Sequence, residues 1–130
     1  GAIYKHDIES LGVDFITPAR DGIGATARCL ILVTPDAQRT MNTFLGAAQH
    51  LPASALDEAQ IADSAVLYLE GYLWDPETPR YAMVRAIEVA RQAGRKVAFT
   101  LSDIACIAPH RAEMMAMVVM RKPFFRNVNG

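Results

Sequence analysis

Two short, almost wholly apolar runs in the second half of the chain predict neighbouring strands of a parallel sheet. Residues 65–69 and 96–101 have strand length and few polar side chains, a pattern typical of strands that helices cover on both faces. Between them, residues 79–94 repeat apolar side chains at helical spacing, with Pro at the expected start and Gly at the expected end. Strand, helix and strand in this order indicate a right-handed βαβ unit.

The first half of the chain has a different pattern and predicts an antiparallel meander. Residues 3–11 carry apolar side chains at helical spacing, and residues 13–16 alternate as in a strand. The β-branched and apolar stretch 26–33 and the returning stretch 39–45 flank a Thr-Pro-Asp-Ala turn at 34–37. We expect a helix followed by strands that pair in sequence order.

Two further helices are expected in the second half. Ser54 is expected to cap a short helix that continues to about Ala62, with acidic residues in its first turn. The last helix is expected from Pro109 to about Met120. Its methionines favour adaptable core packing, with a partner-binding surface as the alternative. They are Met114, Met115, Met117 and Met120.

Composition and charge narrow the classes of function. With 130 residues, 52% hydrophobic and 21% charged, the chain has the length and composition of one globular domain. A net charge of −1 without a basic cluster argues against a nucleic-acid partner. No apolar run is long enough to span a bilayer and no leader is recognisable, so we expect no membrane partner. Cys29 and Cys106 are expected to be buried, reduced thiols of a cytoplasmic protein, with a disulfide as the alternative.

Three local patterns give little support to other chemistries. Residues 22–27 match a G-x-G-x-x-A dinucleotide loop, but a strand follows them rather than a helix, so we interpret them as a turn. Asp103, Cys106 and His110 mix metal-ligand types at a spacing that fits no standard zinc pattern. No Gly-x-Ser-x-Gly elbow or Ser-His-Asp order favours a hydrolase.

Two acidic residues stand where the parallel strands are expected to end. Glu70 follows the run 65–69, and Asp103 follows the run 96–101 after one intervening serine. In open α/β sheets, ligands bind just outside the carboxyl ends of the strands. The pair is therefore a candidate for binding sugar hydroxyls or a hydrated Mg²⁺ ion. The alternative is that Asp103 only turns the chain and that Glu70 pairs with an arginine.

Three segments, in their order and at their intervals, carry a family resemblance. They are residues 34–43 (Thr-Pro-Asp-Ala-Gln-Arg-Thr-Met-Asn-Thr), 68–72 (Tyr-Leu-Glu-Gly-Tyr) and 93–103 (Ala-Gly-Arg-Lys-Val-Ala-Phe-Thr-Leu-Ser-Asp). Over about residues 3–118 the chain resembles the middle portion of the ribokinase-like (PfkB) carbohydrate and nucleoside kinases, closest to the adenosine-kinase-like members. The resemblance implies a Rossmann-like α/β sheet flanked by helices, with a small β-lid over the phosphate acceptor. It implies one incomplete domain over residues 1–130, with the lid meander at 13–48 and the α/β portion at 54–130.

The resemblance also implies a chemistry, which is transfer of the ATP γ-phosphate to a hydroxymethyl group of a sugar or nucleoside, with ATP and Mg²⁺ as the cofactors of the full-length family. By position, Asn42 in the lid and Glu70 at the strand end would contact the acceptor. Asp103 would lie on the phosphate side. Asn127 stands about where the family has the Asn of its Asn-x-x-Glu magnesium motif, but Gly130 replaces the Glu.

The family's Gly-Ala-Gly-Asp segment, which supplies the anion hole and the general base, is not found in these 130 residues. We therefore assign no catalytic residue and expect the polypeptide alone to be inactive as a kinase, because phosphoryl transfer depends on positioning and charge stabilisation. The alternative is a non-catalytic association module built on this half-fold. A homodimer fits both hypotheses, since lids of some family members pair with a neighbour's lid.

Overall fold

The structure is a computed structural model that describes residues 2–119. The chain divides into two compact units, with the boundary between His50 and Leu51. The division expected from the resemblance, into 13–48 and 54–130, stays a prediction.

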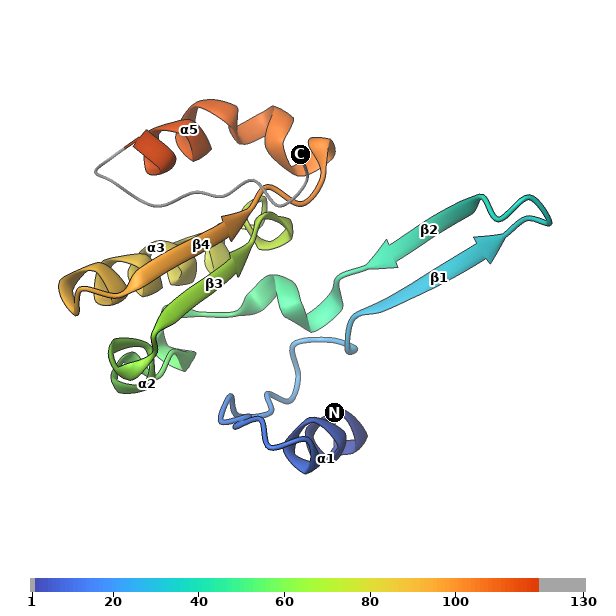
Figure 1. Cartoon of the computed structure of the whole chain (residues 1–130). Helices are drawn as coiled ribbons and strands as arrows, with labels where there is room; N and C mark the ends of the chain where they lie inside the picture. The colour runs from blue at the N-terminus through green and yellow to red at the C-terminus, as the bar shows by residue number, and fades with distance from the viewer. Residues whose placement is uncertain (1, 120–130) are drawn as a thin grey trace. The chain divides into compact units, whose positions relative to one another are not determined.

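The first unit contains one helix, a β-hairpin and a 3-10 turn among its described residues (Figure 1). They are α1 (Ala2–Ser10), β1 (Arg28–Val33), β2 (Arg39–Phe44) and η1 (Gly46–His50). The strands are antiparallel, in a register that pairs Arg28 with Phe44 and Val33 with Arg39. A turn at residues 34–38 joins them, as the Pro and Asp of this segment predict, and the Thr34 amide donates to the Gln38 carbonyl at 3.0 Å.

Two expectations for this unit are wrong. Residues 13–16 form no strand, so the expected meander is a two-stranded hairpin. Val13 and Ile16 are about half exposed, and with no strand paired beside them their alternation is not enough to make an extended ladder. Cys29 is exposed rather than buried, because both faces of the hairpin are open within its unit.

The second unit is built around a parallel pair of strands, as predicted (Figure 1). Its elements are η2 (Ala53–Ala55), α2 (Glu58–Asp63), β3 (Val66–Glu70), η3 (Gly71–Leu73), α3 (Glu77–Gln92), β4 (Lys96–Thr100), α4 (Ile104–Ile107), η4 (Ala108–His110) and α5 (Arg111–Val119). The register runs from Val66 opposite Lys96 to Glu70 opposite Thr100. The helix α3 is the crossover of the βαβ unit, so the mixed α/β class predicted from the sequence is confirmed.

The core of this unit lies on the side of the strands that faces α3. One cluster contains Trp74, Met83, Phe99 and Met114, and a second contains Ile87, Ala90 and Val97. The alternate residues of β3 face away: Val66 is 48% exposed and Tyr68 57% exposed. The expectation that both faces would be covered is therefore wrong for this strand, because apolar composition alone does not say how many layers cover a sheet.

Three helices begin or end at residues other than those expected. The side chain of Asp57, not Ser54, caps α2 by accepting from the Gln60 amide at 2.9 Å. The helix α3 begins at Glu77, so Pro79 lies in its first turn rather than at its first position. The expected helix from Pro109 is divided into η4 and α5, and Met120 lies outside the described residues.

Candidate functional site

Glu70 is the last residue of β3 and is exposed at the carboxyl end of the sheet. Its carboxylate accepts a hydrogen bond of 3.3 Å from the hydroxyl of Tyr68, which lies two residues earlier on the same face. Desolvation and the nearby Glu70 charge raise the pKa of Tyr68, so this hydroxyl stays a donor at neutral pH. Among the described residues, the hydrogen-bond partner of the Glu70 carboxylate is therefore a tyrosine and not an arginine.

The two strand ends approach each other through Gly71. A Cβ atom at this position would lie 2.7 Å from the carbonyl oxygen of Leu101, a distance that no real side chain tolerates. Glycine therefore lets the connection after β3 pass directly against the connection after β4. Glu70 is thus followed directly by the glycine that lets the two connections pass close to each other.

The connection after β4 is strained. Ser102 has a φ of 67°, in the left-handed region that costs a residue with a side chain about 1–3 kcal/mol. Within residues 2–119 its buried hydroxyl has no hydrogen-bond partner, and the same holds for the indole nitrogen of the buried Trp74 in the connection after β3. Strained backbone of this kind gathers at functional sites.

Asp103 follows Ser102 and is exposed at the same edge of the sheet as Glu70. Its carbonyl oxygen accepts from the Cys106 amide at 3.0 Å, which starts α4. Burial raises the pKa of Cys106, and the charges of Asp103 and Asp75 raise it further. The carboxylates of Asp103 and Asp75 therefore both lie near this thiol.

The remaining two residues expected at the site are placed differently. Asn42 lies on β2 opposite Leu30, where an open groove of about 420 Å³ runs along the hairpin. The groove is lined by Arg28, Leu30, Met41, Asn42, Thr43 and Phe44. Asn42 belongs to the first unit, so the structure brings together Glu70 and Asp103 at one sheet edge and describes Asn42 separately. Asn127 lies outside the described residues.

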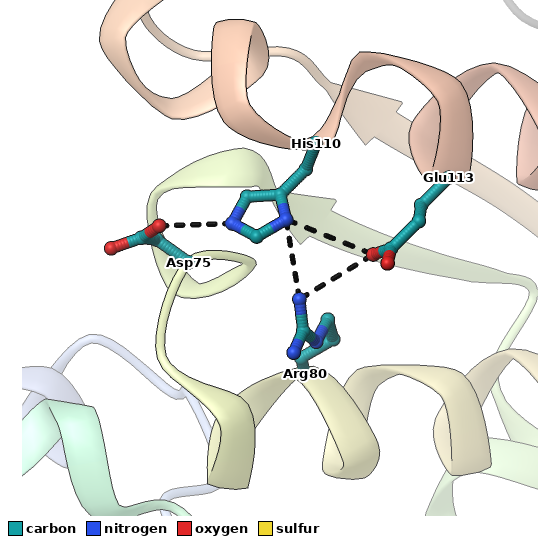
Figure 2. Close-up of polar contacts among 4 residues, drawn as sticks. All are labelled: Asp75, Arg80, His110 and Glu113. Carbon is teal, nitrogen blue, oxygen red and sulfur yellow. Dashed lines mark hydrogen bonds and ion pairs between the residues drawn. The ribbon is translucent and has the colours of Figure 1, made fainter.

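Sequence reasoning missed a polar cluster behind this edge. Figure 2 shows His110 between Asp75, Arg80 and Glu113, which come from the η3–α3 connection, α3 and α5. The members are separated by up to 38 positions in the chain, so no local motif indicates them. In the sequence, His110 stands out only beside Asp103 and Cys106, at a spacing that fits no standard zinc pattern.

Neither a metal site nor a membrane span follows from the described part of the chain. Within residues 2–119, no three His, Cys, Asp or Glu side chains gather closely enough to hold a metal ion. These residues alone therefore do not complete the magnesium site that the family resemblance implies. The helices within the same residues are too short or too polar to cross a bilayer.

A parallel βαβ unit preceded by an antiparallel hairpin is the arrangement that the resemblance to the ribokinase-like kinases implies. Comparison with known protein families agrees with this resemblance, because the family model described as "pfkB family carbohydrate kinase" matches residues 1–123. The chain belongs to the pfkB carbohydrate kinase family.

Solved structures of the family resemble the chain over most of its length. It is 43% identical to the adenosine kinase from Sinorhizobium meliloti, with a TM-score of 0.83, covering 90% of this chain and 36% of that one. A probable sugar kinase from Rhizobium etli CFN 42 shares 39% identity, the same coverage and a TM-score of 0.83. A putative ribokinase II from E. coli, 18% identical with a TM-score of 0.76, covers 91% of this chain and 39% of that one and shows the shared fold. The chain thus spans about a third of these proteins, and no curated protein matches it.

Proposed function

We propose that these residues form the lid and part of the acceptor site of an ATP-dependent kinase that phosphorylates a hydroxymethyl group of a sugar or nucleoside. The observation that carries the proposal is the 43% identity to an adenosine kinase over 90% of this chain. A nucleoside with a ribose hydroxymethyl group is therefore the acceptor to test first.

In this proposal Glu70 accepts hydrogen bonds from acceptor hydroxyls, oriented by the Tyr68 hydroxyl at 3.3 Å. Asn42 offers its amide to the acceptor from the hairpin. Asp103, after the strained Ser102, lies on the phosphate side, and Asn127 belongs to the same side. These roles rest on the resemblance and on the position of each residue in its own element.

We further propose that the 130-residue polypeptide does not transfer phosphate by itself. It contains no Gly-Ala-Gly-Asp segment, and within residues 2–119 no three His, Cys, Asp or Glu side chains gather closely enough to hold a metal ion. Mg²⁺ and ATP are therefore proposed as cofactors of the full-length family members, and not of these 130 residues by themselves. We expect a cytoplasmic location, which suits the two free thiols.

One observation favours a second function, which is association. Every residue of β1 and β2 is exposed within its unit, including Leu30, Leu32 and Met41 at 63% or more. An exposed apolar hairpin with unpaired strand edges promotes pairing with another chain. We propose a homodimer through this hairpin, whether or not an acceptor binds.

The experiment is a titration of the purified chain with adenosine and with ribose by isothermal calorimetry, beside a coupled assay with Mg²⁺ and ATP. We expect binding that Glu70→Gln weakens about tenfold, no phosphorylated product, and a dimer by native mass spectrometry. Glu9→Gln on α1 is the matched control. The Glu9 carboxylate is exposed, forms a surface ion pair with Lys5 at 3.7 Å and is not one of the proposed site residues. No binding of either compound refutes the acceptor role, and turnover refutes the proposed inactivity.

A further inference from the structure

His110 makes directional contacts through both ring nitrogens (Figure 2). Nε2 lies 2.9 Å from a carboxylate oxygen of Asp75, and Nδ1 lies 3.2 Å from an Arg80 guanidinium nitrogen. Glu113 lies 3.7 Å from Nδ1, too far for a hydrogen bond, and 3.4 Å from the same Arg80 nitrogen. The imidazole is thus held on two sides, with only 17% of its side chain exposed.

These contacts define which nitrogen carries the proton. A guanidinium only donates, so Nδ1 accepts from Arg80, and a carboxylate accepts, so Nε2–H donates to Asp75. Glu113 pairs with Arg80 and keeps the guanidinium turned toward the ring. The result is a chain of four side chains, in which Arg80 donates to both Glu113 and His110, and His110 donates to Asp75.

The cluster joins the two connections that leave the carboxyl ends of the sheet. Asp75 follows η3 on the connection after β3, and His110 ends η4 on the connection after β4. Glu70 is the last residue of β3, directly before the first connection, and Asp103 lies near the start of the second. The connections touch at Gly71 near the strands, and the His110–Asp75 bond joins them a second time farther along.

We propose that His110 is a positioning residue that, through Asp75 and Arg80, holds these two connections together and so fixes Glu70 and Asp103 relative to each other. The significance of the two carboxylates for an acceptor rests on the proposed function above. The clamp itself is a property of the fold. A histidine whose tautomer is set by a carboxylate and whose contacts support site residues from behind is a recurrent way to make a site precise.

The first test is spectroscopic and needs no ligand. Long-range ¹H–¹⁵N correlation of the labelled imidazoles is expected to show the Nε2-protonated tautomer for the neutral ring of His110. The exposed His6 serves as the internal comparison. A pattern averaged between tautomers for His110 would overturn the proposal.

The second test measures amide hydrogen exchange in residues 71–75 and 103–108. His110→Leu keeps the bulk of the side chain without its hydrogen bonds, and His110→Gln can still donate to Asp75 and accept from Arg80. We expect exchange in both segments to rise about three- to tenfold in His110→Leu and to be largely restored in His110→Gln. Equal exchange in the two variants would show that the ring acts only by packing.

A third variant protects the test against a folding failure. Asp75→Ala removes the carboxylate from an exposed position, with its side chain 66% exposed, so the core is untouched. We expect Asp75→Ala to raise amide exchange in residues 71–75 and 103–108 as His110→Leu does. Asp63→Ala, at the exposed end of α2, is expected to leave exchange in both segments unchanged. No effect of Asp75→Ala would overturn the clamp.

Adenosine titration of the same variants separates the two proposals. If the wild-type chain binds adenosine, Asp75→Ala is expected to weaken binding several-fold without touching the ligand, and unchanged affinity would refute positioning. If the wild-type chain binds neither adenosine nor ribose, the proposed function fails, and the tautomer and exchange results still decide the clamp.

Discussion

Replacing Met114 by alanine tests the packing of α5 on the core of the second unit. Met114 is 1% exposed and packs with Trp74, Met83 and Phe99. Truncating a fully buried methionine costs about 2–5 kcal/mol, because the lost contacts leave a cavity that the neighbours fill only in part. For a domain of this size that predicts a fall in melting temperature of about 10 °C or more.

Met115 on the same helix provides the control. It is 52% exposed, so Met115→Ala makes the same chemical change with almost no loss of packing. The expected effect is within about 0.5 kcal/mol. Urea unfolding followed by the fluorescence of Trp74, the chain's single tryptophan, measures both variants at the core itself. Equal stability of Met114→Ala and Met115→Ala would refute the packing of α5 described here.

Three further predictions concern other parts of the chain. Gly71→Ala is expected to lower stability by about 1–3 kcal/mol in urea unfolding, because the new Cβ meets backbone at 2.7 Å. Arg85 donates to Glu58 at 2.7 and 2.8 Å and lowers the pKa of that carboxyl below 4.5, so the stability from this pair is complete above about pH 4.5 and lost as the pH falls below it. Iodoacetamide is expected to modify the exposed Cys29 several-fold faster than Cys106, whose pKa is raised, as read by peptide mass spectrometry.

Each of these has its own contrary result. A Gly71→Ala protein as stable as the wild type would show that the strand ends do not touch. A stability difference between wild type and Glu58→Gln that does not shrink between about pH 5 and pH 3 would show that the Arg85 pair contributes nothing. Faster modification of Cys106 than of Cys29 would contradict its burial.

The sequence predicted the elements whose signal is local. The apolar runs at 65–69 and 96–101 and the helix between them appear as β3, β4 and α3, because strand length, periodicity and a closing glycine are all encoded nearby. The Thr-Pro-Asp-Ala turn likewise predicts the hairpin. Glu70 and Asp103 are found at one sheet edge because parallel strands end on the same side.

What the sequence did not predict depends on contacts across the chain. The alternation at 13–16 gave a false strand, since a strand needs a partner that the pattern does not reveal. Cys29 is exposed because nothing within its unit covers the hairpin. The amino-acid composition does not predict whether a strand is covered. The cluster around His110 joins residues 35 positions apart, so only the folded βαβ unit brings them together.

The most direct test of the central claim is an NMR titration of the ¹⁵N-labelled 130-residue chain with adenosine. If the chain carries the acceptor half-site of a pfkB family kinase, the amides of Glu70, Gly71 and Asp103 shift together with that of Asn42, and Glu70→Gln raises the adenosine concentration needed for the response about tenfold. If adenosine and ribose leave these amides unmoved, or shift only residues elsewhere, the acceptor-site account is wrong.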